Sequence, residues 1–596
     1  MINKMRWVFK FIRKNGILCL VQHIFFVIIH AEKKDYNWWR KKHTLTKIVL
    51  KKQNMLSFQI QPVISILLPL RCAEKKYIKK MIKSIQLQTY FNWELCISDG
   101  SGSNNSEKYI FSYVAKNDNR VKLVTSEREL SDAENLNSAL KIATGDYIAL
   151  SGEGDLLENN ALYECIKIIN QYPKTDIIYT DEDIIDKEGK KFFCPHFKSD
   201  FNLDLLRSMN YIDHLFVVKK DIQQQVGMFS EYFYREYEYD FILKCIEKSK
   251  NIYHIPKVLY HKRNIKKKVP KSSINEHILA DEKVEVVKLH LERSQVAGKV
   301  SFVDGYNLCK VEYTLKAPPL ISILIPNRDH IKDLERCVLS LYEVSEYTNF
   351  EIIIIENGSV DKKTFNYYKS LTEKYENVKI IIWKGNKEFN YSALNNFGVK
   401  YAIGEYLLFL NNDTEIINKN CISEMISNAV REEVGAVGAK LLYPDGSIQH
   451  AGVILGLGGI AGHAFREYRH NAKGYFSRIF CKQNYSAVTA ACLLMSKELF
   501  NEIGGFDENL KVAFNDVDLC MKIRSLGKLI VYTPYAELYH FESKSRGKED
   551  TEEKQSRFHG EVEYFKAKWK KELEMGDPYY NPNLSLEKND FSIRVV

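Results

Sequence analysis

Short runs of β-branched and other apolar residues alternate along this chain with longer stretches in which apolar residues recur at the helical period. In the second half, the pattern predicts strands near 320–326, 350–355, 378–382 and 405–410. Helices are expected between them, near 330–344, 361–375 and 391–402. From about residue 60 the first half repeats this order. Such alternation predicts right-handed βαβ crossovers and an α/β fold whose mostly parallel sheets are covered on both faces.

The two halves also repeat each other in sequence. Residues 62–69 read PVISILLP, and residues 319–326 read PLISILIP. Further on, residues 145–155 lie over residues 404–414. A repeat of this length is a duplicated domain, because a solenoid unit has a period of about 20 to 50 residues. We therefore expect two tandem domains between an N-terminal and a helical C-terminal extension, with bounds at 1–58 (basic extension), 59–300 (first domain), 301–318 (linker), 319–550 (second domain) and 551–596 (C-terminal extension).

Polar residues follow the predicted strands of the second domain. Asn327 and Glu356 end two of them, and Asn411 to Asp413 follow a third. Ligands of doubly wound sheets bind at these carboxyl ends. Mg²⁺ or Mn²⁺ accepts one or two carboxylates together with phosphate oxygens, so Asp413 can serve as a metal ligand. The alternative is a turn in which Asn and Asp side chains cap the next helix.

A second acidic group lies further along. Asp516 and Asp518 open a stretch whose apolar residues continue at helical spacing. One carboxylate can cap this helix while the other points into a cleft, and capping alone is the alternative.

In this order, the motifs resemble the family two glycosyltransferases, which have the GT-A fold. The resemblance covers roughly residues 62–265 and 318–547. It is carried by Ile321–Arg328, the Glu356–Ser359 turn, Asn390–Asn396, the Asn411–Asp413 form of the D-x-D motif, the Asn515–Asp516 pair and His540–Ser543. The Asn411–Asp413 variant and the segment Ile448–Gly452 look most like rhamnosyltransferases and relatives that build bacterial surface polysaccharides.

The resemblance implies an inverting transfer of a sugar from a dTDP- or UDP-sugar, with rhamnose as one candidate, to a growing lipid-linked surface glycan. Asp516 would be the catalytic base, and Asp413 would hold Mn²⁺ or Mg²⁺ on the diphosphate. His540 would touch the metal or a phosphate, although a core histidine bonded to a backbone carbonyl is the alternative. The residues implied in donor binding are Pro326, Asn327, Arg328, Glu356, Asn396, Asn411, Asn412, His540 and Arg546, the last of which can also be simply solvated.

The first domain departs from this pattern. Gly152 and Gly154 occupy the acidic positions of its motif, although a slip of one residue would bring Asp155 into play. Its remaining candidates for a vestigial or alternative site are Asp99, Glu153, Asp155, Glu238, Asp240 and His261. We expect impaired catalysis here, with a role in holding the acceptor or bracing the second domain. The competing interpretations are a second, rewired transferase for another sugar and, for the whole chain, a glycan-binding scaffold.

Charge and the N-terminal segment narrow the partners. The net charge is +10, but no basic stripe with interleaved aromatic residues appears, so nucleic acid is not expected. The twelve cysteines form no C-x-x-C pair, which fits a reducing cytosol. Five basic residues precede an apolar run at 17–30, which is shorter than the roughly twenty residues that span a bilayer. It predicts a helix that either packs on the first domain or lies in the membrane interface. A signal peptide is disfavoured, because no cleavage site of small residues follows the apolar run. We expect a cytoplasmic protein, peripheral on the inner face of the membrane, acting on a polyprenyl-linked glycan.

Overall fold

The computed structural model describes residues 36–71, 74–102, 118–264, 276–385, 389–541 and 551–594. The predicted apolar helix at 17–30 and the donor-binding candidate Arg546 lie outside these residues. Chain contacts divide the protein into two compact units. Unit 1 comprises residues 1–198, 212–274 and 593–596, and unit 2 comprises residues 199–211 and 275–592.

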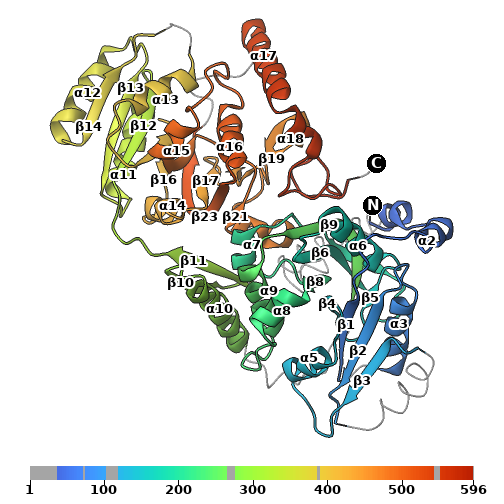
Figure 1. Cartoon of the computed structure of the whole chain (residues 1–596). Coiled ribbons are helices and arrows are strands. Elements are labelled where there is room, and N and C mark those ends of the chain that lie inside the picture. Colours follow the sequence, from blue (N-terminus) through green and yellow to red (C-terminus); the bar gives the residue numbers. More distant parts are fainter. Residues whose placement is uncertain are drawn as a thin grey trace, which may run out of the picture. The chain divides into compact units, whose positions relative to one another are not determined.

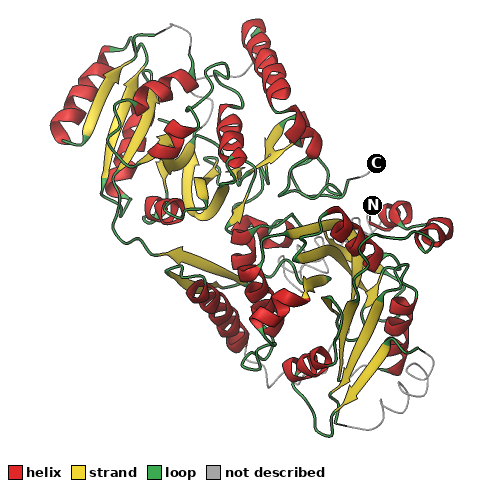
Figure 2. Ribbon diagram, in the orientation of Figure 1, coloured by secondary structure: helices red, strands yellow, loops and turns green. Residues whose placement is uncertain are grey.

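Unit 1 is a mixed sheet with helices on its faces (Figures 1 and 2). The strand order is β3-β2-β1-β4-β8-β6-β9-β5, with β7 beside β6. The strands are β1 Ile64–Leu70, β2 Trp93–Asp99, β3 Val121–Thr125, β4 Tyr147–Leu150, β5 Leu156–Leu157, β6 Ile177–Ile185, β7 Phe192–His196, β8 Phe216–Lys219 and β9 Ile252–Arg263. The helices are α2 Lys47–Gln53, α3 Lys75–Gln86, α5 Asp132–Lys141, α6 Ala161–Gln171, α8 Lys220–Val226 and α9 Tyr237–Lys248, and a further helix ends at residue 43.

Unit 2 repeats this sheet in the order β14-β13-β12-β15-β22-β17-β23-β16, with β18 beside β17 and β21 beside β23. Its strands are β12 Ile321–Asn327, β13 Phe350–Glu356, β14 Val378–Ile382, β15 Tyr406–Leu410, β16 Thr414–Ile416, β17 Val434–Leu442, β18 Ile448–His450, β21 Gln483–Asn484, β22 Cys492–Ser496 and β23 Leu529–His540. Two hairpins stand apart from the sheet, β10 Gly298–Val303 with β11 Leu308–Tyr313, and β19 Val453–Leu455 with β20 Ala461–His463.

The helices of unit 2 are α7 Leu203–Ser208, α10 Glu276–Arg293, α11 Ile331–Glu343, α12 Lys362–Lys374, α13 Tyr391–Val399, α14 Cys421–Ala429, α15 Lys497–Glu502, α16 Asn515–Ser525, α17 Glu552–Lys568 and α18 Lys570–Met575. Short 3₁₀ turns lie at η2 Leu457–Gly459 and η3 Tyr475–Phe480. The strands and helices predicted between residues 320 and 410 are therefore confirmed, with ends that differ by a few residues.

Burial on both faces explains why the central strands read as continuous apolar runs. Ile321, Ile323 and Ile325 of β12 pack with α11 on one side of the sheet. Leu324 points to the other side, where Gly398 lets α13 approach so closely that an added Cβ would lie 2.8 Å from it. The predicted α/β fold, rich in parallel pairs, is confirmed, and the structure adds a strand, β22, that runs antiparallel to both neighbours.

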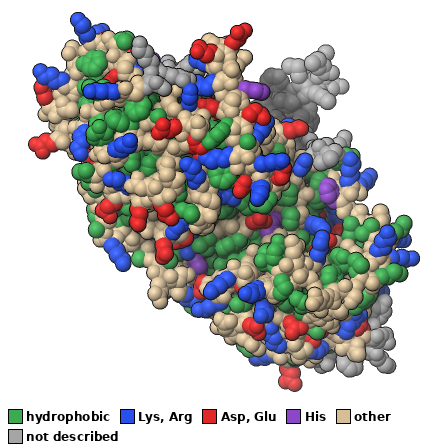
Figure 3. All heavy atoms as spheres, turned by 45° about the horizontal axis from the view of Figure 1, so that its top comes forward, with side chains coloured by type: hydrophobic (Ala, Val, Ile, Leu, Met, Phe, Trp, Pro, Cys, Tyr) green, Lys and Arg blue, Asp and Glu red, His purple; other side chains and the backbone are tan. Residues whose placement is uncertain are grey.

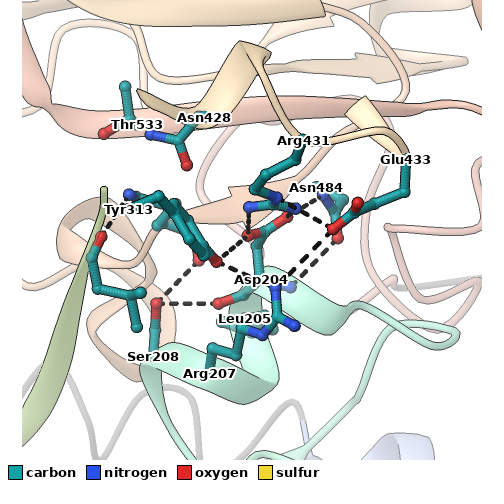
Figure 4. A network of polar contacts seen from close by, with 12 residues as sticks. Asp204, Leu205, Arg207, Ser208, Tyr313, Asn428, Arg431, Glu433, Asn484 and Thr533 are labelled. Atoms are coloured by element: carbon teal, nitrogen blue, oxygen red, sulfur yellow. Dashed lines mark hydrogen bonds and ion pairs between the residues drawn. The ribbon is translucent and has the colours of Figure 1, made fainter. Parts of the chain in front are cut away.

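Residues 199–211 leave unit 1 and belong to unit 2, where α7 packs among strands of the second sheet (Figure 4). The buried carboxylate of Asp204 forms two contacts with Arg431, at 2.6 and 3.0 Å. The Asn484 side chain also donates to Asp204, at 2.7 Å, and the Asn484 backbone exchanges two hydrogen bonds with the side-chain amide of Asn202. The compact units thus differ from the predicted boundaries: 199–211 and all of 275–318, including a helix and a hairpin, are part of unit 2.

Candidate functional site

The carboxyl ends of three parallel strands in unit 2 are joined by side-chain hydrogen bonds. Asn412, which follows β15, donates to Asn327 Oδ1 at the end of β12, with 2.6 Å between the atoms. Asn327 in turn donates to the Tyr368 hydroxyl at 2.8 Å, and Tyr368 donates to Glu356 at the end of β13 at 2.7 Å. The structure therefore brings together the strand-end residues that the sequence singled out.

The Glu356 carboxylate is buried and accepts bonds from the backbone and the hydroxyl of Ser359 as well as from Tyr368. Its oxygens thus order the turn after β13, and its predicted contact with the nucleotide stays a prediction. Pro326 is half-buried and Arg328 is exposed at the end of β12.

Asp413 and His540 form a buried pair beside this edge. Pairing of β16 with β23 places Thr414 opposite His540, so the preceding Asp413 reaches the imidazole, with 3.2 Å between Oδ1 and Nε2. Asn411 Nδ2 also lies 3.2 Å from Nε2. Burial alone would raise the pKa of the Asp413 carboxyl, but His540 and the nearby Arg336 hold that pKa below its usual value.

The second ring nitrogen of His540 contacts a side chain too. Nδ1 lies 2.6 Å from Gln449 Oε1, so it carries the proton and donates it to the amide oxygen. In the neutral ring, Nε2 can accept from the Asn411 amide and also lies next to the Asp413 carboxylate, where a proton or a cation would offset the negative charge. Ring nitrogens that ligate metals are commonly oriented by such a bond at the other nitrogen. The pair therefore fits a divalent cation, and a core histidine bonded to a backbone carbonyl does not describe His540.

Asp516 lies in the first turn of α16 and is half-buried. Its carboxylate accepts from the backbone of Val517 at 2.8 Å and of Ala490 at 3.2 Å. The next residue, Ala491, accepts a bond from the backbone of Asn411 at 3.1 Å. Two consecutive residues thus connect Asp516 to the loop that carries Asp413, which places both carboxylates along one edge of the sheet.

Asp518 has a different environment. It is fully buried, and its Oδ1 lies 2.7 Å from Lys568 Nζ and 2.8 Å from the Trp569 indole nitrogen. Asp518 therefore joins α16 to the end of α17. The predicted role of Asp516 as the catalytic base stays a prediction.

Asn396 exchanges hydrogen bonds with the backbone of Phe506, both at 3.0 Å. In this conformation it holds the glycine turn before α16 against α13. Its predicted role in donor binding stays a prediction.

Sequence reasoning missed three residues at this edge: Arg336, Tyr368 and Gln449. Arg336 stacks on Phe541, with 3.5 Å between the guanidinium carbon and the ring centroid. It is one of many basic residues on helices, so no sequence signal marks it. Gln449 lies inside the Ile448–Gly452 segment, which the sequence singled out as a motif without assigning the residue a role.

In unit 1, strand register corrects the alignment of the two motifs. β5 pairs with β9 so that Leu156 lies opposite His261, as Thr414 lies opposite His540. Asp155 therefore takes the place of Asp413, and Gly154, with a positive φ of 85°, lies outside this correspondence. The expectation that Gly154 faces Asp413 is wrong, and the alternative one-residue slip is what the strands show.

In unit 1, Asp155 and His261 correspond to Asp413 and His540 but have different hydrogen-bond partners. Asp155 accepts from the Tyr260 hydroxyl at 2.6 Å and from the backbone of Arg263 at 2.7 Å. Both nitrogens of His261 meet carboxylates, with Asp183 at 2.6 Å and Glu158 at 3.1 Å. Burial alone would lower the pKa of His261, but the two carboxylates raise it to about 9. A protonated imidazole with both N–H groups donated has no lone pair for a metal.

Register also places Asp213 and His214 where unit 2 has Ala490 and Ala491, because Lys219 pairs with Tyr147 as Ser496 pairs with Tyr406. His214 lies 3.6 Å from Glu238, which opens α9 as Asp516 opens α16.

Glu182, Asp213 and His214 are close enough to share a metal, and within the described ranges no other group of three or more such residues is found. Lys262, at 2.7 Å from Asp213, and Lys198, at 3.3 Å from Glu182, already offset their charge. Positive charge from these lysines opposes a cation at this cluster.

The remaining candidates of unit 1 are held by local contacts. Glu153 accepts from the backbone of Arg71 at 2.8 Å, and Asp240 pairs with Lys244 at 2.5 Å. Asp99 is buried at the end of β2 and accepts from the backbone of Ser101 at 3.1 Å. These residues lie at the same sheet edge as their counterparts in unit 2, but with different partners.

A family model described as glycosyl transferase family 2 matches residues 65–227 and again 322–504. The chain belongs to this family. Each of the two large sheets forms the core of a GT-A domain, as the shared strand order and the two matches indicate. The chain is 42% identical to the uncharacterized protein y4gI of Sinorhizobium fredii, over 89% of this chain and 58% of that protein. It is 31% identical to the O-antigen biosynthesis protein RfbC of Myxococcus xanthus, over 94% of this chain and 43% of that protein.

The chain thus spans about half the length of these two curated relatives. A shorter segment, 22% of the chain, is 37% identical to 51% of WfgD of Escherichia coli, a UDP-Glc:alpha-D-GlcNAc-diphosphoundecaprenol beta-1,3-glucosyltransferase. Among solved structures, GalNAc-T7 with UDP, GalNAc and Mn²⁺ matches with a TM-score of 0.36 and 14% identity, over 46% of this chain and 51% of that chain.

Proposed function

We propose that unit 2 is an inverting glycosyltransferase that moves a sugar from a nucleotide-diphosphate donor to a growing surface glycan. Family membership and the likeness to an O-antigen biosynthesis protein support this activity. The observation that carries it is the arrangement of the Asp413–His540 pair and the half-buried Asp516 along one sheet edge.

Asp516 acts as the general base in this proposal. Its half-buried carboxylate takes the proton of the acceptor hydroxyl while the hydroxyl oxygen bonds to the anomeric carbon. The bond from that carbon to the nucleotide diphosphate breaks on the opposite face, so the configuration inverts. A positioned base of this kind contributes about 10²- to 10⁴-fold to the rate.

The strand-end network forms the floor of the donor site. Asn327 and Asn412 are fixed by each other, and Tyr368 fixes Asn327 to Glu356, so these groups are preorganised before a donor binds. Asp413 and His540 would hold a divalent cation, Mn²⁺ or Mg²⁺. That cation would offset charge on the departing diphosphate.

The motif resemblance and one relative support a choice of donor and acceptor. We propose a UDP- or dTDP-sugar, with rhamnose as one candidate, and a polyprenyl-linked acceptor at a membrane surface. A diphosphoundecaprenol acceptor stands in the name of the Escherichia coli relative, which supports a lipid-linked glycan here.

We further propose that unit 1 does not catalyse metal-assisted transfer and instead holds the acceptor or braces unit 2. The contacts that occupy Asp155 and both nitrogens of His261 favour this role. A bifunctional enzyme is the second candidate, because Glu238 keeps an acidic group at the position of Asp516.

Release of nucleotide from a panel of nucleotide-diphosphate sugars, followed by mass spectrometry with and without Mn²⁺, tests the proposal. The full chain should turn over one donor, and Asp516→Asn should lower turnover by about 10²- to 10⁴-fold. Glu238→Gln, the equivalent change in unit 1, is the matched control and should leave turnover within about twofold. Loss of activity in Glu238→Gln but not in Asp516→Asn would assign catalysis to unit 1. Binding of a glycan without turnover of any donor would favour the scaffold.

A further inference from the structure

The helix that ends at residue 43 has one face fixed to unit 1. Tyr36 and Trp39 are buried and pack against Phe197, with ring centroids 6.5 and 5.0 Å from it. Tyr36 also donates to Asp183 at 2.5 Å. Trp38, on the other side of the helix, is exposed. The sequence left open whether this segment packs on the domain or faces a membrane, and its two faces allow both.

The next helix, α2, exposes apolar residues as well. Ile48 is 69% exposed and Val49 is exposed next to it. At the end of α2, a turn closed by a bond from Met55 N to Lys52 O presents Met55, which is 84% exposed, and Leu56. Large apolar side chains that gather on a surface mark interaction sites, whereas single ones are ordinary.

A hydrogen bond joins this turn to the loop between α3 and β2. Thr89 donates to the buried Gln53 Oε1 at 3.1 Å. Leu87 and Phe91, each two residues from Thr89, are exposed, Phe91 by 57%. We call the docking face the set of exposed apolar residues from these elements, namely Trp38, Ile48, Val49, Met55, Leu56, Leu87 and Phe91.

The segment that carries Trp38 and α2 is basic. Residues 36–61 contain six lysines and arginines and no aspartate or glutamate. Lys41, Lys47, Lys51 and Lys52 are exposed among the apolar side chains. Figure 3 shows basic and hydrophobic side chains intermingled at its right edge, on the side where α2 lies in Figure 1. An acidic surface is the complement of such a face.

We propose that the docking face binds the surface of an anionic phospholipid bilayer. Apolar tips among lysines, with a tryptophan at the rim, suit the boundary between headgroups and acyl chains, where burial of apolar area adds to attraction for acidic lipid. This inference rests on the proposed function in one respect: a lipid-linked acceptor would give the protein a reason to bind a membrane. In the described part of the chain, no helix is long and apolar enough to cross a membrane.

Flotation of the full chain with vesicles tests this inference. Binding to vesicles with about one third phosphatidylglycerol should exceed binding to pure phosphatidylcholine, and salt should weaken it because surface charges are screened. The double variant Met55→Glu, Leu56→Glu should bind at least about tenfold more weakly. Lys51→Gln with Lys52→Gln should weaken binding by about 25-fold, since each lysine near such a surface contributes about fivefold.

Met575→Glu is the matched control, because Met575 is 82% exposed in α18 of unit 2. It should bind vesicles like the unchanged chain. Equal binding by the Met55, Leu56 double variant would overturn the proposal and assign docking to another segment, and failure of the unchanged chain to bind would exclude a lipid partner. Nucleotide release without vesicles separates the two proposals, since it should be unchanged in the double variant whether or not vesicles bind.

Discussion

The substitution Arg431→Met tests whether the ion pair between α7 and Arg431 stabilises unit 2. Arg431 lies almost fully buried against Asp204, with a second carboxylate, Glu433, at 3.0 Å from its Nε. Burial alone would raise the pKa of Asp204, but Arg431 and Arg207 hold that pKa well below its usual value. Methionine fills much of the same volume but leaves the Asp204 charge without its main partner.

The cost follows from that uncompensated charge. Removing one partner of a buried ion pair destabilises a protein by about 3 to 5 kcal/mol. At about 2.1 cal/mol/K per residue, a unit of roughly 330 residues has an unfolding entropy near 0.7 kcal/mol/K. The thermal midpoint of unit 2 should therefore fall by about 4 to 7 °C.

Scanning calorimetry of the full chain measures this shift, because the two units contribute separate heat if they unfold separately. Lys419→Met is the control, since Lys419 and its partner Glu346 are exposed, and a surface pair contributes about 0 to 1 kcal/mol. An Arg431→Met midpoint within about 1 °C of the unchanged chain would refute the reasoning. The double variant Asp204→Leu, Arg431→Met should recover much of the loss, because the carboxylate left without its main partner is then removed as well.

Three further outcomes follow from the contacts at the two sites. Gln449→Leu removes the partner that orients His540 and should raise the Mn²⁺ concentration for half-maximal turnover by about 10- to 100-fold; an unchanged metal titration would contradict it. Tyr368→Phe should lower the free energy of unfolding by about 1 to 3 kcal/mol, and with it the thermal midpoint, because Asn327 loses a buried hydrogen-bond partner. An unchanged midpoint would show that this network does not contribute to stability. The pKa of His261, raised to about 9, means that its stabilisation is complete below the unfolded value of about 6.5 and is lost as pH rises through about 9. The midpoint of unit 1 should fall over that range, and less steeply in His261→Gln; equal slopes would exclude the imidazolium.

The sequence predicted the parallel core well because each strand there is buried on both faces. Apart from Ser322 and Glu351 near their starts, Ile321–Asn327 and Phe350–Glu356 are apolar runs that end in a polar residue, so both the strand and its polar end are visible in the residues alone. The position of Asp413 followed from the same logic.

Two features could not be predicted from the sequence, each for a physical reason. The antiparallel strand β22, Cys492–Ser496, reads like any buried strand, because direction leaves no mark on apolar composition. The helix α7 joins unit 2 through Asp204, whose partners Arg431 and Asn484 lie more than 200 residues away along the chain. Local periodicity carries no information about contacts of that range, and the same limit hid the neighbours of His540 and His261.

The path of residues 199–211 also has a consequence for biosynthesis. A ribosome releases α7 long before it has made Arg431 or the strand that contains Asn484. Unit 1 must therefore emerge with this segment still waiting for its partners, and its Asp204 remains hydrated until the second sheet forms. Folding of the first half can begin during translation, but it is completed only when the second half arrives, so the halves are not independent modules that could be exchanged between genes by a cut at residue 300.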